Sequence, residues 1–245
     1  MLQPEPDKQL LGPPWGVADF LMIVLGGYVA VLVAGVLLMG TELSPSALVV
    51  VSALATSVGQ IGGVVAILQR RKGRLSDLGF EVEGGDGVFL FLGAGLQFLM
   101  AIAFQPLAEA VESDGTTQAV ADSIASAQQL TVKIAIMVLV GLVAPIMEEL
   151  AFRGVLLSAT RRRIGPVWAA VVTAVVFSLF HTLGIQQDNW LAGLITLLQL
   201  LIAGLVLAAL TIRRGRLGPA IFTHAGFNLV TLMILFSGIS LEAVQ

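Results

Sequence analysis

Long apolar runs separated by short polar connections make up most of the chain. A helix needs roughly 20 mostly apolar residues to cross the hydrocarbon core of a bilayer. Lipid also requires every backbone N–H and C=O to find an internal partner, and the runs lack the alternation of a barrel strand. The pattern therefore predicts an all-α, polytopic transmembrane helix bundle of about seven spans: Val17–Met39, Ala47–Gln69, Val88–Phe104, Thr131 to about Thr160, Val167–His181, Leu191–Ile212 and Gly218–Phe236.

The connections between these runs alternate in charge. Three of them are basic, and the connections between these carry mainly acidic residues. Basic connections favour the cytoplasmic side of a membrane, so the alternation predicts a cytosolic N-terminus and an acidic extracytoplasmic side. The basic set is Arg70, Arg71, Lys72 and Arg74, then Arg161, Arg162 and Arg163, then Arg213, Arg214 and Arg216; the acidic set is Glu42, then Glu109, Glu112, Asp114 and Asp122, then Asp188.

The composition supports a chain embedded in lipid. Of 245 residues, 57% are hydrophobic and 12% are charged, whereas a soluble domain is about 45–50% apolar and about a quarter charged. The net charge is −3 and the basic residues stand in short clusters between apolar runs, which is a pattern of membrane topology and not of nucleic-acid binding. The absence of cysteine excludes disulfides, thiolate nucleophiles and Cys-ligated zinc. We expect an integral, multi-pass protein of the plasma membrane of a prokaryote, surrounded by the lipid bilayer and without a nucleic-acid partner.

Four segments follow from this pattern. Residues 1–16 form a polar, Pro-rich cytosolic tail, and residues 17–130 form accessory transmembrane helices and a polar loop, with a short surface helix at Thr117–Leu130. Residues 131–236 hold the ionisable groups discussed below, and residues 237–245 form a short C-terminal tail.

The fourth span is too long for one straight crossing. From Thr131 to Arg163 a continuous helix would extend about 50 Å, against a hydrocarbon core of about 30 Å. It must protrude, tilt or break, and Pro145 offers a place to bend because it removes one helix hydrogen bond. Glu148 and Glu149 follow three and four residues later.

Ionisable residues inside spans are costly and mark functional sites. Glu149 and Arg153 are four residues apart with the acid first, the favourable orientation for an ion pair along one helix face. Glu148 lies about 100° around the helix from Glu149, so we interpret Glu149 as the structural partner of Arg153 and Glu148 as the free carboxylate. Both histidines of the chain, His181 and His224, also fall within or at the end of a span.

Spacing indicates how these groups approach one another. A hairpin turning near Gly165 would place Glu148 and His181 at the same depth, because they lie at nearly equal distances along the chain from that glycine. His224 and Asn228 are four residues apart and share one face of the last span. His224 lies closer to its own turn at Gly215, and the spacing alone does not fix the offset of this span.

Three motifs in these spans resemble those of a known family. EELAFR (Glu148–Arg153), FSLFH (Phe177–His181) and HAGFN (His224–Asn228) are similar, in this order, to the EExxxR, FxxxH and HxxxN motifs of the CPBP family. That family includes CAAX prenyl endopeptidases, bacteriocin-processing and Abi-type immunity proteins, and lysostaphin-resistance-like membrane proteins. The resemblance covers roughly Val132 to Phe236, so residues 131–236 are expected to be a CPBP-like catalytic core.

The resemblance implies an intramembrane endopeptidase that needs no cofactor or metal. It implies that Glu148 is the base that activates water with His181 as its partner, and that His224 and Asn228 are the oxyanion donors. Preformed donors of this kind are typically worth about 3–4 kcal/mol each. Glu149, Arg153 and Phe177 are the supporting residues: Arg153 holds Glu149, and Phe177 packs the wall. The implied substrates are membrane-embedded or lipidated peptides, including prenylated proteins of the CAAX type.

Two other functions remain open from the sequence. A zinc-dependent membrane protease could use the same residues, because two histidines and a glutamate form a known catalytic ligand set. The HExxH motif is absent, however. A non-catalytic membrane scaffold or immunity protein is the other alternative, in which Glu148 and Glu149 belong to a helix end and His181 bonds only to a backbone carbonyl; His224, inside an apolar span with Asn228 on the same face, fits this alternative less well. A scaffold has no need of a buried Glu–His pair, which favours the protease.

Overall fold

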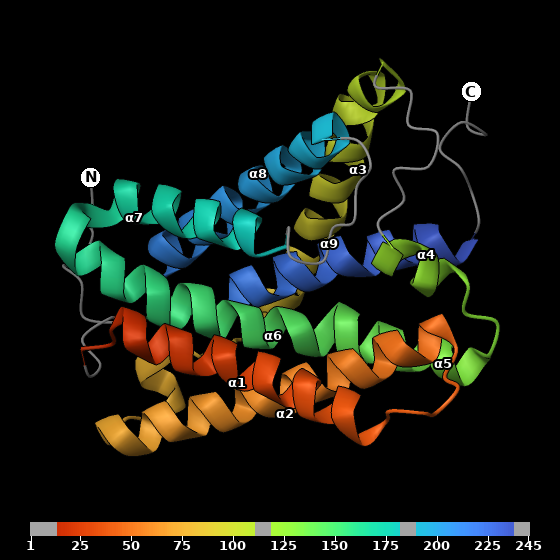
Figure 1. The fold of residues 1–245 in the computed structure, drawn as a ribbon. Helices are drawn as coiled ribbons and strands as arrows, with labels where there is room; N and C mark the ends of the chain where they lie inside the picture. Colours follow the sequence, from red (N-terminus) through yellow and green to blue (C-terminus); the bar gives the residue numbers. More distant parts are fainter. Residues whose placement is uncertain (1–13, 111–118, 182–189, 238–245) are drawn as a thin grey trace.

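The computed structural model describes residues 14–110, 119–181 and 190–237, and within these ranges helices joined by short connections form the whole fold, with no strand (Figure 1). The all-α bundle predicted from the sequence is thereby confirmed. The parts of the tails at 1–13 and 238–245, and the acidic residues Glu112, Asp114 and Asp188, lie outside the described ranges. The α-helices are α1 (Val17–Leu37), α2 (Pro45–Arg71), α3 (Phe89–Ala110), α4 (Ala119–Ala125), α5 (Leu130–Val138), α6 (Ala144–Glu149), α7 (Ser158–His181), α8 (Trp190–Arg214) and α9 (Gly218–Ser237).

Six helical stretches of the described chain are long and apolar enough to cross a membrane, and one of them is the 52-residue stretch Leu130–His181. Gly165 interrupts that stretch with φ 77° and ψ 170°, a conformation that glycine adopts without steric cost. Pro166 follows, and Figure 1 shows α7 bending back into a returning arm. The two arms of this hairpin correspond to the predicted fourth and fifth spans, which accounts for the difference between the six stretches of the described chain and the seven predicted spans.

Pro145 does not break the first arm of the hairpin. The arm runs through α5, the π-helical segment η3 (Leu139–Val143), α6 and a second π-helical segment η4 (Leu150–Leu157) without leaving helical dihedral angles. A π turn closes its hydrogen bonds over five residues and is frequent at functional sites. The proline is thus accommodated by a local change of helix type, and two such changes flank Glu148 and Glu149.

The three basic connections gather at one end of the bundle, which we call the arginine end. Arg71 at the end of α2 pairs with Asp19 at the start of α1, at 2.8 Å. Arg162, in the hairpin, donates to the carbonyl of Trp15 at 2.5 Å, and Arg216, after α8, pairs with Glu83 at 2.8 Å. Their shared location agrees with the predicted alternation, and the cytosolic orientation of this end stays a prediction.

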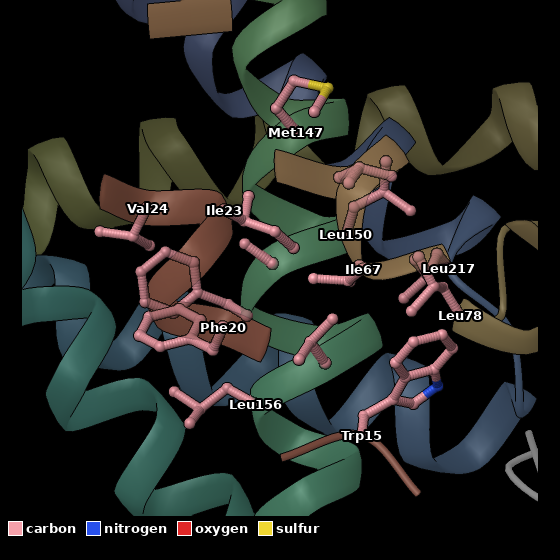
Figure 2. Close-up of a cluster of buried hydrophobic side chains, with 14 of the residues drawn as sticks. Trp15, Phe20, Ile23, Val24, Ile67, Leu78, Met147, Leu150, Leu156 and Leu217 are labelled. Atoms are coloured by element: carbon pink, nitrogen blue, oxygen red, sulfur yellow. The ribbon is translucent and has the colours of Figure 1, made fainter. Parts of the chain in front are cut away.

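The largest buried apolar cluster among the described residues extends from Trp15, beside the arginine end, to Met147 on α6 (Figure 2). Trp15, Leu78 and Leu217 are almost fully buried there and pack against α1 and the first arm of the hairpin. The opposite end carries α4. The expected short surface helix is present as α4, which is shorter than predicted: Asp122 and Ala125 are exposed, whereas Ile124 is buried where α4 packs against α2 and α9. This helix therefore covers part of the bundle.

Helices α3 and α9 cross in close contact through two glycines. A Cβ added to Gly93 would overlap the carbonyl oxygen of Thr223, and one added to Gly226 would overlap that of Leu90. Small residues of this kind allow membrane helices to approach closely. The crossing fixes the position of α9 along the bundle axis, which the spacing in the sequence left undetermined. Gly226, at the crossing, lies two residues from both His224 and Asn228.

Candidate active site

The two histidines converge on one carboxylate. Glu148, on α6, has its Oε2 atom 3.5 Å from His224 Nε2 and 3.9 Å from His181 Nε2. No hydrogen bond satisfies this oxygen, although it is buried. Glu148 and His181 do lie at the same depth, as the hairpin spacing predicted, and α9 adds the second histidine. Three separate helices therefore present their ionisable side chains to one point.

The orientation of the His181 ring determines which of its nitrogens faces Glu148 and whether that nitrogen donates or accepts a hydrogen bond. His181 Nδ1 lies 2.8 Å from the carbonyl oxygen of Phe177, one turn earlier on α7. A carbonyl only accepts, so Nδ1 carries the proton, and in the neutral ring Nε2 presents its lone pair. Both Nε2 of His181 and the carboxylate of Glu148 are then acceptors, and a group placed between them must supply hydrogens to both.

Glu149 lies at the centre of a fully buried polar chain. Its Oε1 atom accepts from Arg153 Nη1 at 2.8 Å and from His224 Nδ1 at 3.0 Å. Glu149 and Arg153 are both 0% exposed. The geometry of the predicted pair with Arg153 is therefore present, and the contact with His224 is an additional one that the sequence did not indicate. His224 thus lies between the two carboxylates, with one ring nitrogen facing each.

Arg153 and Phe177 support this chain from the side of α7 and α8. The second guanidinium nitrogen of Arg153 donates to the carbonyl of Gly204 on α8 at 3.1 Å. The guanidinium also stacks over the ring of Phe177, with 4.6 Å between its carbon and the ring centroid, a favourable contact between a cation and a ring face. Phe177 in turn contacts the rings of His181 and His224, with centroids 4.5 and 5.7 Å apart. The ring of Phe177 thus packs against both histidine rings and helps to fix their positions.

Asn228 satisfies a carbonyl that the first π segment leaves without a backbone donor. In η3 the N–H of Ala144 reaches back five residues to Leu139, and the next donor in that register would be Pro145, which has no N–H. The side-chain amide of Asn228 donates to the carbonyl of Val140 at 3.0 Å. One amide hydrogen of Asn228 is used in this way and the other remains for the cavity that the residue lines.

A cavity of about 630 Å³ opens from this cluster. Its lining comes from the first arm of the hairpin and from α3, α4, α7, α8 and α9, and most of it is apolar. Glu148, Phe177, His181, His224 and Asn228 all line it, whereas Glu149 and Arg153 do not. The predicted site residues therefore divide into five that a bound molecule can touch and two that act from behind.

No group of three or more His, Asp or Glu side chains in the described part of the chain is arranged to hold a metal ion. At the candidate site, Glu148 faces the two histidines. The arrangement is suited to general acid–base chemistry, because a carboxylate and an imidazole nitrogen both face the cavity within hydrogen-bonding reach of a shared small molecule.

Residues 130–230 match the family model described as Type II CAAX prenyl endopeptidase Rce1-like. The matched segment contains all three motifs, from Glu148 to Asn228, and the resemblance to the CPBP family of CAAX proteases is thereby confirmed. The matched family is a protease family, which supports a peptidase in an integral, multi-pass membrane protein. No curated protein and no solved structure matches the chain.

Proposed function

From the match to this protease family and the geometry around Glu148, we propose that the chain is an intramembrane endopeptidase in which Glu148 activates a water molecule. The observation that supports it most directly is the position of Glu148 Oε2. This oxygen faces two imidazoles across 3.5 and 3.9 Å, has no hydrogen bond, and lies on the wall of a largely apolar cavity.

His181 and Glu148 together are suited to bind the attacking water. Their facing atoms are too far apart for a direct hydrogen bond at 3.9 Å, and polar groups at such a separation are commonly bridged by water. Since both atoms accept, a bridging water would donate one hydrogen to each and direct its lone pair toward the substrate carbonyl. Glu148 then takes the proton as the oxygen attacks, and the same proton is available for the leaving amine.

His224 and Asn228 supply the donors for the oxyanion in this proposal. Nδ1 of His224 already donates to Glu149 at 3.0 Å, so Nε2 can donate to an oxyanion only when the ring is an imidazolium. Glu149 acts as a positioning residue, because its carboxylate holds that ring with Nε2 directed toward the cavity. Asn228 contributes the amide hydrogen that is not used by Val140. Each donor of this type is worth about 3–4 kcal/mol in the transition state.

The substrate class follows from the cavity and the family together. A mainly apolar cavity surrounded by six helices is suited to an apolar segment delivered from the membrane. We therefore propose membrane-associated peptides as substrates, among them lipidated and prenylated CAAX-type peptides such as the name of the matched family indicates.

Purified protein in detergent or nanodiscs, incubated with lipidated and unlipidated peptides, tests the activity. Glu148→Gln keeps the shape of the side chain and removes the base, so it should abolish cleavage without changing thermal stability. Glu42→Gln, at an exposed connection, is the matched control and should cleave at the rate of the native protein. Cleavage retained in Glu148→Gln would remove Glu148 from the role of base.

A zinc-dependent reaction is the second candidate, and one observation favours it: both Nε2 atoms face the same carboxylate oxygen. Activity lost on exhaustive chelation and restored by zinc would establish this candidate, whereas activity that survives chelation would support activation of water by Glu148 alone. A protein that binds the peptides and cleaves none of them would be the scaffold alternative.

A further inference from the structure

The cavity extends to only one side of the ionisable cluster. On α9, which starts at the arginine end with Gly218, its lining begins at Thr223 and continues past Asn228 to Leu235, near the far end of the helix. On the first arm of the hairpin the lining is Val140, Ala144 and Glu148, and it stops there. The next turns toward the arginine end, residues 149–159, are all buried.

Packed side chains and a short backbone pairing close the arginine end. The N–H of Leu217 donates to the carbonyl of Gly79 at 2.8 Å, and that of Gly218 donates to the carbonyl of Glu81 at 3.2 Å. Leu78 and Leu217 fill the space beneath this pairing and are 0% and 1% exposed (Figure 2). No lining residue of the cavity belongs to this region, so the cluster is separated from the arginine end by the packed core.

The opposite end supplies the rest of the lining. Ala121 and Ile124 of α4 line the cavity together with Thr231 and Leu235 of α9. Helix α4 contacts α2 and α9, and its Ile124 belongs to a buried cluster with residues of α5 and of the end of α9, which places α4 at the end away from the arginines (Figure 1). Among the described lining residues, Glu148, His181 and His224 are the only titratable ones, and the remaining polar lining consists of amides and hydroxyls.

Amide and hydroxyl groups on an apolar wall are suited to an extended, uncharged peptide, because they can bond its backbone without requiring a charge. Gln97 of α3 and Gln199 of α8 provide amides, and Thr196 and Thr231 provide hydroxyls. Basic connections mark the cytoplasmic side of a membrane protein, and all three lie at the closed end. We infer that the active site is reached from the extracytoplasmic face, and that its substrate is an apolar, uncharged peptide segment presented at that face.

The part of this inference that concerns a substrate rests on the proposed function. The direction from which the cavity is reached can be measured without catalysis. The native chain has no cysteine, so single cysteines report their own accessibility. Three variants serve: Thr231→Cys in the cavity, Ser126→Cys exposed just after α4, and Arg163→Cys exposed in the hairpin turn. Each is treated with a membrane-impermeant cationic methanethiosulfonate, in sealed vesicles of inside-out and of right-side-out orientation.

Thr231→Cys should react in the same vesicles as Ser126→Cys, the right-side-out ones, and should be protected in the vesicles in which Arg163→Cys reacts. Reaction of Thr231→Cys from the Arg163 side would overturn the direction of access. Protection of Thr231→Cys on both sides would overturn it as well, because the cavity would then be closed to the α4 end. If Ser126→Cys reacted only in inside-out vesicles, the substrate would be cytoplasmic and the extracytoplasmic assignment would be wrong.

The substrate class is tested in proteoliposomes with the protein in one known orientation. An uncharged apolar peptide and a variant carrying two lysines in the same segment are added outside or enclosed inside, with Glu148→Gln as the inactive control. The uncharged peptide should be cleaved at least tenfold faster from the α4 side than from the arginine side, and faster than the lysine variant. Equal rates from the two sides, or for the two peptides, would refute the inference. Absence of cleavage under every condition would refute the proposed function and leave the labelling result as it stands.

Discussion

Glu149 and Arg153 can be removed singly and together to measure what the buried pair contributes. Glu149→Leu and Arg153→Met replace each charge with an apolar side chain of similar length. Both residues are 0% exposed, and their side chains meet at 2.8 Å. Breaking such a pair by removing one partner typically costs about 3–5 kcal/mol, because the other charge stays buried and unpaired, whereas removing both is often close to neutral.

The double variant should therefore cost far less than the sum of the singles. The singles together amount to roughly 6–10 kcal/mol by that range. The double variant still loses the bond from His224 Nδ1 to Glu149, worth about 1.5–3 kcal/mol for a charged hydrogen bond. The expected coupling energy is thus above about 3 kcal/mol. Reversible unfolding in mixed detergent measures all four proteins. Additivity within about 0.5 kcal/mol would show that the two residues do not form one unit.

The same variants distinguish a specific effect of Glu149 on the position of His224 from a general loss of stability. The chain has only two histidines, so a protein labelled with ¹⁵N-histidine gives two sets of ring signals, and His181→Gln assigns them. Glu149→Leu should shift the His224 signals and lower kcat more than it raises KM, since the oxyanion donor is affected. Arg153→Met leaves the contact between Glu149 and His224 in place and should shift them less. Unchanged His224 signals in Glu149→Leu would refute the positioning role of Glu149.

Three further outcomes are expected. Asn228→Ala should lower kcat about 10²–10³-fold with a smaller change in KM. It should also destabilise the fold by about 1–3 kcal/mol, because a buried carbonyl loses its donor. A raised KM with intact kcat would instead assign Asn228 to substrate binding. Activity should persist after exhaustive chelation, as followed by peptide cleavage before and after dialysis against a chelator. Gly93→Ala should lower both stability and activity, because its Cβ would overlap the Thr223 carbonyl, whereas Gly95→Ala, with nothing within 4 Å of its added Cβ, should be unchanged in both assays.

The sequence was sufficient for the features that depend on local pattern. Apolar run length predicted the spans, and the equal spacing of Glu148 and His181 from Gly165 predicted their shared depth because a hairpin turn fixes it. The helix ends differ by a few residues, since lipid-facing turns continue into interfacial residues such as Arg71 at the end of α2. The turn at Gly165 was predicted correctly, whereas Pro145, where the sequence allowed a bend, only changes the helix type.

The contacts made by α9 could not be predicted in the same way. Its height relative to α6 is set by the crossing at Gly93 and Gly226, and a crossing depends on two surfaces that are far apart in the sequence. The contact of His224 with Glu149 follows from that height. The packing of α4 against α2 and α9 could not be predicted for a similar reason, because its seven residues are too few to display a clear apolar face.

The carbonyl of Val140 has a consequence for the order in which the protein assembles. The donor that satisfies it, Asn228, belongs to α9, which is synthesised after every other described helix. An unsatisfied carbonyl in hydrocarbon costs several kcal/mol, and Glu149 likewise lacks its contact with His224 until α9 inserts. The first arm of the hairpin, which carries Val140 and Glu148, therefore cannot reach its final conformation until α9 inserts, although it enters the membrane well before. A chain still emerging from the ribosome should hold an incomplete site, so that proteolysis begins only once synthesis of α9 is finished.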